Sequence, residues 1–219
     1  AIMPVHLEGK MANMPRIKEI ADRHGIFVVE DAAQSFGSHF SGKMPGSLSD
    51  VACFSLHPLK NLNAAGDGGF VATNRSSVAD RLKILRNHGQ SSRNVSNEFG
   101  FVSRLDSIQA SIVNIKLDDL GGTIARRREL ADMYNHGLGN LKLKTPIVQR
   151  DVYHSYHLYV IEIDNRDSIQ TRLAESGIET KIHYPTLICD QIAYQNKYHD
   201  KVLNIDKARF QSKRILSLP

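Results

Sequence analysis

Two short apolar runs constrain the fold of this chain most, because each leads into one chemically distinctive polar residue. Residues 26–29 are continuously apolar and lead to Asp31, and residues 51–56 lead through a polar turn to Lys60. A continuous apolar run of this length is typical of a strand buried on both faces of a sheet. Open α/β sheets place their ligands beyond the carboxyl ends of such strands. We therefore expect an α/β sheet that presents a carboxylate and an amine.

An amine nucleophile and a fixed carboxylate in this arrangement suit pyridoxal 5'-phosphate (PLP). Lys60 can form a Schiff base with the cofactor aldehyde. Asp31 can keep the pyridine nitrogen protonated, so that the ring becomes an electron sink. Considered alone, Lys60 is an exposed turn lysine and Asp31 a turn or helix-capping aspartate, although the capping role is compatible with the cofactor role.

Six motifs in a fixed order resemble the DegT/DnrJ/EryC1/StrS family of sugar aminotransferases. Each motif alone is weak evidence, but together they extend the resemblance over residues 1–219. They lie at 31–34 (Asp-Ala-Ala-Gln), 54–62, 66–69, 86–89, 103–110 and 182–185.

The resemblance implies a fold-type-I PLP enzyme of the aspartate aminotransferase superfamily. Such a protein has an α/β cofactor domain with a mostly parallel central sheet and a smaller α+β C-terminal domain. We expect the first, with its connecting helices, at 1–140 and the second at 141–219. Both ends of the chain look truncated, since a strand-like run starts at residue 2 without a methionine and the family's chain continues beyond 219. The family also implies a homodimer with active sites at the interface.

The resemblance also assigns cofactor contacts. Lys60 and Asp31 are the expected catalytic residues, with Gln34 on the hydroxyl side of the ring and Ser55 at the phosphate. His57 lies between strand and lysine, where it either contacts phosphate or only packs.

One position departs from the family pattern. The family carries an asparagine that reaches the neighbouring subunit's cofactor phosphate where this chain has Val102. Valine cannot form that hydrogen bond, so Ser103 or Arg104 is the expected substitute.

His88, His183 and Tyr184 occupy motif positions that the family uses near its substrate. A histidine at such a position serves equally well as a polar packing residue. The remaining histidines lack metal-ligand spacing, so we expect no metal site.

The implied reaction transfers an amino group, commonly from glutamate, to a keto deoxysugar attached to a nucleotide. Related dehydratases replace the lysine with histidine, and Lys60 argues against that reading. Amination of a cyclitol or another ketone stays open. A non-catalytic regulatory homologue is favoured by Val102 and opposed by the combination of Lys60, Asp31 and Gln34.

Composition agrees with a globular protein. The 219 residues are 41% hydrophobic and 23% charged, which are ordinary values. No apolar run suits a membrane span, and we expect no signal peptide. Two cysteines, Cys53 and Cys189, suggest reduced thiols in a cytoplasmic protein. The net charge of +5 suits an anionic ligand or simply a basic surface, and no nucleic-acid-binding motif accompanies it.

Local patterns predict the remaining elements. A helix should run from an Asn13 cap to Gly25. We further predict strands at 51–56, 69–73, 152–163 and up to 182, helices at 77–86, 104–117, 125–134 and 166–176, a loop at 87–100, and a helix break at Gly121-Gly122.

Overall fold

The computed structural model describes residues 1–198 and 204–219, which form two compact units. The first unit comprises Ala1–Glu129 and Val148–His157, and the second comprises Leu130–Ile147 and Leu158–Pro219. These units do not follow the single cut at 140/141 that we expected. Segment 148–157 belongs to the first unit, where β8 (Val152–Tyr153) pairs with β2 (His39–Phe40). The second unit begins within helix α4 (Leu120–Leu138).

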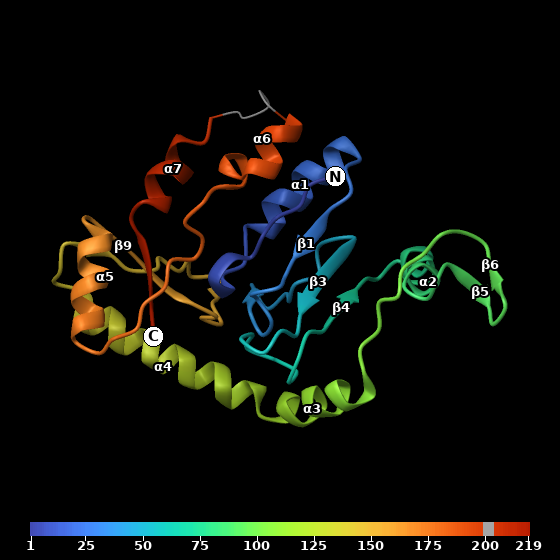
Figure 1. Cartoon of the computed structure of the whole chain (residues 1–219), viewed down its shortest axis with the longest axis horizontal. Helices are drawn as coiled ribbons and strands as arrows, with labels where there is room; N and C mark the ends of the chain where they lie inside the picture. The colour runs from blue at the N-terminus through green and yellow to red at the C-terminus, as the bar shows by residue number, and fades with distance from the viewer. Residues whose placement is uncertain (199–203) are drawn as a thin grey trace. The chain divides into compact units, whose positions relative to one another are not determined.

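The sheet of the first unit has the order β1-β3-β4 (Figure 1). β1 (Val29–Asp31) is parallel to β3 (Val51–Ser55), and β4 (Gly69–Ala72) is antiparallel to β3. The N-terminal segment lies parallel to β1 through bridges from Ile2 to Val28 and from Val5 to Asp31. The first predicted strand starts later than expected, because the backbone N–H of Ile26 donates to Ala21 O at the end of the preceding helix.

Helix α1 (Met14–His24) forms as its sequence predicts. The Asn13 side chain accepts a hydrogen bond from Arg16 N at 3.2 Å, and Gly25 ends the helix with a left-handed φ of 61°. One face of α1 packs into a core whose buried members are Met11, Met14, Ala21 and Val28. A helix of 11 residues is marginal alone, so this packing on the sheet stabilises it.

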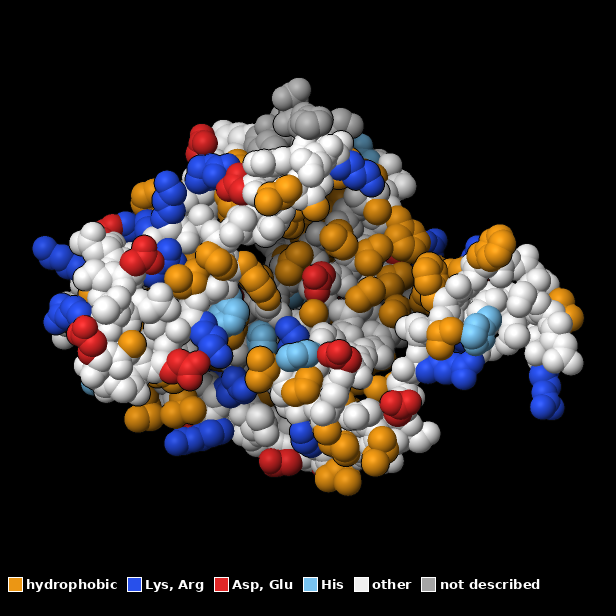
Figure 2. Space-filling view, in the orientation of Figure 1, with side chains coloured by type: hydrophobic (Ala, Val, Ile, Leu, Met, Phe, Trp, Pro, Cys, Tyr) orange, Lys and Arg blue, Asp and Glu red, His pale blue; other side chains and the backbone are white. Residues whose placement is uncertain are grey.

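The predicted 87–100 loop contains a short hairpin, which corrects the sequence reading. Helix α2 (Ser76–Leu85) is followed by β5 (Gln90–Ser92) and β6 (Val95–Ser96). Polar residues dominate both strands, so no hydrophobic alternation marked them. The hairpin projects beyond α2, away from the β1-β3-β4 sheet (Figure 1). Hydrophobic side chains lie on the surface of this projection (Figure 2), including the exposed residues Val95, Phe99, Phe101 and Val102.

The predicted helix break lies at Asp119, between α3 (Ser107–Asp118) and α4, rather than at the glycine pair. Thr123 N donates to Asp119 O, so the first turn of α4 already includes Gly121 and Gly122. Glycine weakens a helix through backbone entropy without preventing it. The buried Ile124 holds this turn in the first unit.

The second unit contains an antiparallel sheet of order β10-β9-β7. The predicted 152–163 strand is divided into β8 and β9 (Tyr159–Ile163), because the intervening carbonyls of His154, Tyr156 and His157 accept hydrogen bonds from Arg127 and Arg128. The expected strand up to 182 is reduced to one bridge, Lys181 to Ser217. The other elements are β7 (Leu143–Lys144), α5 (Arg166–Glu175), η2 (Ile188–Asp190), α6 (Ile192–Tyr198), α7 (Asp206–Ser212) and β10 (Ile215–Leu218).

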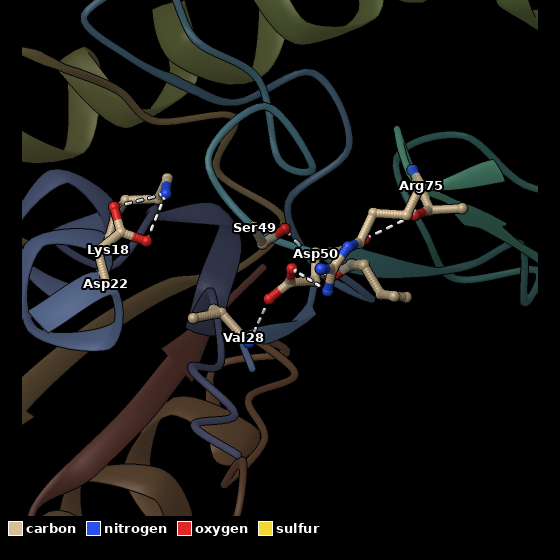
Figure 3. A network of polar contacts seen from close by, with 8 residues as sticks. Lys18, Asp22, Val28, Ser49, Asp50 and Arg75 are labelled. Atoms are coloured by element: carbon tan, nitrogen blue, oxygen red, sulfur yellow. Dashed lines mark hydrogen bonds and ion pairs between the residues drawn. The ribbon is translucent and has the colours of Figure 1, made fainter. Parts of the chain in front are cut away.

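A polar network joins the starting ends of the strands in the first unit (Figure 3). Asp50 Oδ2 accepts from Val28 N at 2.7 Å, and Asp50 Oδ1 pairs with Arg75 Nη1 at 2.8 Å. The network borders a hollow of about 360 Å³. Val28 precedes β1 and Asp50 precedes β3, whereas Asp31 is the last residue of β1. The hollow therefore lies at the amino-terminal ends of these strands, and Asp31 lies at the carboxyl-terminal end.

Within the described residues, no helix combines the length and the apolar content that crossing a membrane requires.

Candidate active site

Asp31 is the last residue of β1, where its backbone is fixed from both sides. Its N–H donates to Pro4 O at 2.9 Å, and its carbonyl accepts from His6 N at 3.1 Å. Its Oδ1 accepts from Ala33 N at 3.0 Å. The carboxylate therefore caps the following turn and has a fixed orientation, as a partner for a ring nitrogen requires.

Lys60 lies in the turn that follows β3. Its N–H donates to His57 O at 2.8 Å, and its carbonyl accepts from Asn63 Nδ2 at 2.7 Å. Burial lowers the pKa of the Lys60 amine, and the negative charge of Asp31 opposes that shift. The charge of Asp31 is therefore close enough to Lys60 to act on it.

The negative charge of Asp31 also acts on Cys53. Cys53 faces Asp31 in the parallel register of β1 and β3. Burial raises the pKa of its thiol, and the Asp31 carboxylate raises it further. The Asp31 charge thus acts on the side chains of both Lys60 and Cys53.

Helix α3 and segment 148–157 hold the Lys60 loop from two sides. Gln109 Oε1, from α3, accepts from Ala65 N at 2.8 Å, and Lys116 donates to the Asn63 side chain. Asn61 Nδ2 donates to Ser155 O at 3.3 Å. Leu56, Leu62 and Ala64 pack with Val113 of α3 in one apolar cluster. The loop is therefore built into the core.

Gln34 and Ser55 come from the same strand ends. Gln34 is only 8% exposed, and its Oε1 accepts from Glu8 N at 2.6 Å. Ser55 is the last residue of β3, and its Oγ accepts from His57 N at 3.3 Å. His57 is exposed, and its Nδ1 accepts from Leu59 N. The bonds of His57 are thus local to the turn.

The donor set fits PLP. An amine with a lowered pKa is suited to condense with an aldehyde, and an oriented carboxylate is suited to a pyridinium N–H. Lys60 and Asp31 supply these two groups at adjacent strand ends. A buried carboxamide, Gln34, and a hydroxyl, Ser55, complete the set.

Arg104 and His88 make their observed contacts at the base of the projecting hairpin. Arg104 Nη2 donates to Asn87 Oδ1 at 2.8 Å, and His88 N donates to Phe101 O. Val102 forms a bridge with Asn87 and is 67% exposed. None of these contacts reaches the Asp31 and Lys60 strand ends.

His183 and Tyr184 belong to the second unit. His183 Nδ1 lies 2.9 Å from Ser217 Oγ on β10, and Tyr184 is exposed. Their role at a substrate stays a prediction from the resemblance.

Sequence reasoning missed the turn η1 (Leu7–Gly9) and two buried serines that contact it. Glu8 and Gly9 both have left-handed φ angles, 64° and 95°. A Glu-Gly pair directly after a strand-like run is the signal that could have revealed the turn. Ser38 and Ser155 gave no comparable signal, because each is remote from the turn in sequence.

Comparisons with known proteins establish the family of the chain. A sequence model of the DegT/DnrJ/EryC1/StrS aminotransferase family matches residues 1–219, and the chain belongs to that family. A dTDP-3-amino-3,4,6-trideoxy-alpha-D-glucose transaminase of Streptomyces venezuelae is 38% identical over 220 residues, covering 100% of this chain and 58% of the relative. A pleiotropic regulatory protein of Geobacillus stearothermophilus is 37% identical over 222 residues, covering 100% of this chain and 59% of the relative. The chain therefore spans less than two thirds of these relatives.

Solved structures show the same α/β fold. The crystal structure of S. venezuelae DesV in complex with a ketimine intermediate superposes with a TM-score of 0.93 at 37% identity, over 99% of this chain and 58% of DesV. NtdA from Bacillus subtilis, solved with its bound cofactor PMP, gives 0.87 at 31% identity, over 100% of this chain and 51% of NtdA. Structural relatives of the chain thus bind this type of cofactor.

Proposed function

We propose that this protein is a PLP-dependent aminotransferase that moves an amino group to a keto sugar attached to a nucleotide. Family membership and the transaminase relative support the class of reaction. The observation that carries the proposal is the Lys60 amine, whose pKa is lowered by burial and which interacts with the Asp31 charge at neighbouring strand ends.

Lys60 and Asp31 would have separate roles in the reaction. Bound PLP withdraws electrons from the carbon that carries the amino group. Lys60 would attach the cofactor covalently and afterwards accept and return the proton at that carbon, and burial favours these roles because it lowers the pKa of the amine. Asp31 would hold the pyridine nitrogen in its protonated form.

Binding and orientation fall to the remaining groups. Ser55 would donate its hydroxyl to the phosphate, with His57 or Arg104 as further phosphate partners, and Gln34 would contact the ring hydroxyl side. His88, His183 and Tyr184 are proposed to line the substrate site. Glutamate is the proposed amino donor.

A homodimer forms part of the proposal. The segment that follows the projecting hairpin carries Phe99, Phe101 and Val102, which are 101%, 71% and 67% exposed. A second copy of the chain would cover such apolar groups, and exposed patches of this kind mark interaction sites.

The test is the visible absorption spectrum of the full-length protein with PLP, recorded before and after glutamate is added. We expect a band that requires Lys60, is absent in Lys60→Ala, and is lost to the amino form of the cofactor with glutamate. Lys83→Ala, at an exposed lysine of α2, is the matched control and should keep the band.

A regulatory protein is the second candidate, since one relative carries that description at 37% identity. A natural protein without a Lys60-dependent band would refute the aminotransferase proposal and favour this alternative.

A further inference from the structure

The turn Leu7–Gly9 lies against the candidate site in an uncommon backbone conformation. It follows the segment that pairs with Asp31, since His6 N donates to Asp31 O. Glu8 has a φ of 64°. A non-glycine residue pays roughly 1–3 kcal/mol for a left-handed conformation, so surrounding contacts must hold it there.

Two fully buried serines provide those contacts. Ser38 Oγ lies 2.6 Å from Gly9 O and 2.8 Å from Ser155 Oγ. The same Gly9 carbonyl accepts from Ser155 N at 3.1 Å. Both serines are 0% exposed, so each of these bonds lies away from water. Hydrogen bonds in such a place are costly to leave unmade.

Position 9 accepts only glycine without a shift of its neighbours. Its φ of 95° is strained for any side chain, and a Cβ there would lie 2.7 Å from Ser155 Oγ and 2.8 Å from His157 N. One of those contacts is with backbone, which cannot rotate away. Gly9→Ala should therefore displace the turn.

A hydrogen bond from the turn sets the orientation of the Gln34 carboxamide. Glu8 N donates to Gln34 Oε1 at 2.6 Å. A carboxamide whose oxygen accepts in this way has its NH₂ group, a double donor, at the other end. The side chain of Glu8 takes no part in this bond.

We propose that the Leu7–Gly9 turn is a positioning element for Gln34: the Glu8 N–H fixes the carboxamide so that its Nε2 donates to the ring oxygen of PLP. This inference rests on the proposed function and deepens it. A donor at that oxygen stabilises its negative form. The visible absorption of bound PLP changes with pH, and loss of the donor should raise the pH at which this change is half complete, here called the midpoint.

Three variants of the full-length protein test the role. Gln34→Ala removes the donor, Gly9→Ala displaces the turn, and Lys83→Ala, at an exposed lysine of α2, is the control. We expect the first two to raise the midpoint and to weaken PLP binding about tenfold, the effect of one hydrogen bond. Lys83→Ala should leave both values unchanged. The double variant of Gly9 and Gln34 should shift no further than Gln34→Ala, because coupled residues are not additive.

The outcomes separate the two proposals. A Gly9→Ala protein with the natural midpoint, beside a shifted Gln34→Ala, overturns the positioning role alone. A natural protein without a Lys60-dependent band overturns the proposed function and this inference with it. If circular dichroism shows that Gly9→Ala does not fold, the Ser38→Ala/Ser155→Ala double variant replaces it, with the same expected shift and the same refuting result.

Discussion

Removing the buried Glu30 carboxylate should destabilise the first unit strongly. Glu30 is 0% exposed, and His6, also 0% exposed, lies 2.5 Å from it through Nε2. His6 Nδ1 accepts from Ala12 N, so Nε2 carries the proton that it donates to Glu30. Glu30 Oε1 accepts from Gly46 N at 2.8 Å. The carboxylate thus joins three segments around β1.

The magnitude follows from the donors left behind. Glu30→Ala leaves two buried N–H groups without an acceptor, at about 1–3 kcal/mol each. The expected loss is therefore about 2–6 kcal/mol, a range that includes the usual cost of breaking a buried pair. Glu30→Gln keeps one acceptor oxygen and should cost about half as much. Urea denaturation of the full-length protein, followed by circular dichroism, measures both.

The pH dependence gives an independent check. Burial opposes ionisation of Glu30, but hydrogen bonds from the His6 and Ser49 side chains and the Gly46 amide outweigh it and hold its pKa below 4.5. The unfolded chain binds this proton first as the pH falls. The natural protein should therefore lose the stabilisation below about pH 4.5, whereas Glu30→Gln should lack this part of the slope. A loss under about 1 kcal/mol in Glu30→Ala would refute the reasoning.

Three further predictions concern the first unit. Asp31→Asn should lower the pKa of Cys53, because the raising charge is removed, and thiol alkylation at pH 8 should become faster; an unchanged rate would contradict their proximity. Asp50→Ala removes a backbone N–H acceptor and an ion-pair partner and should cost about 1–3 kcal/mol in denaturation, whereas the exposed Asp22→Ala should cost under about 0.5 kcal/mol. Burial first, and nearby cations second, lower the pKa of His154 from 6.5 to about 3. Between those values the unfolded chain binds a proton that the folded chain does not, so stability should fall on acidification by up to about 1.4 kcal/mol per pH unit, and His154→Gln should flatten that slope.

Local signals in the sequence were sufficient for several elements. The Asn13 cap and Gly25 predicted both ends of α1, and the apolar run at 51–56 predicted β3. Caps and apolar runs act through neighbouring residues, so the chain carries their information locally. The α5 helix was predicted in the same way.

The same reasoning was wrong where distant groups compete for the backbone. Arg127 and Arg128 bind the carbonyls that divide the predicted 152–163 strand. The break expected at Gly121-Gly122 lies at Asp119, because helical hydrogen bonding tolerates the two glycines. Neither the division of this strand nor the position of the helix break can be predicted from the residues that are adjacent in sequence.

The sequence by itself determined the family and located the candidate site residues in its motifs. Asp31, Gln34 and Lys60 stand in motifs within the residues 1–219 that a sequence model of the family matches, and each lies at or shortly after the end of a strand. Only the tertiary structure decided how those groups are held. It brought the Glu8 N–H to Gln34, placed Ser155 against Gly9 across 146 positions, and set the Asp31 charge beside Lys60. Burial and hydrogen-bond geometry depend on packing between distant segments, which local sequence patterns do not encode.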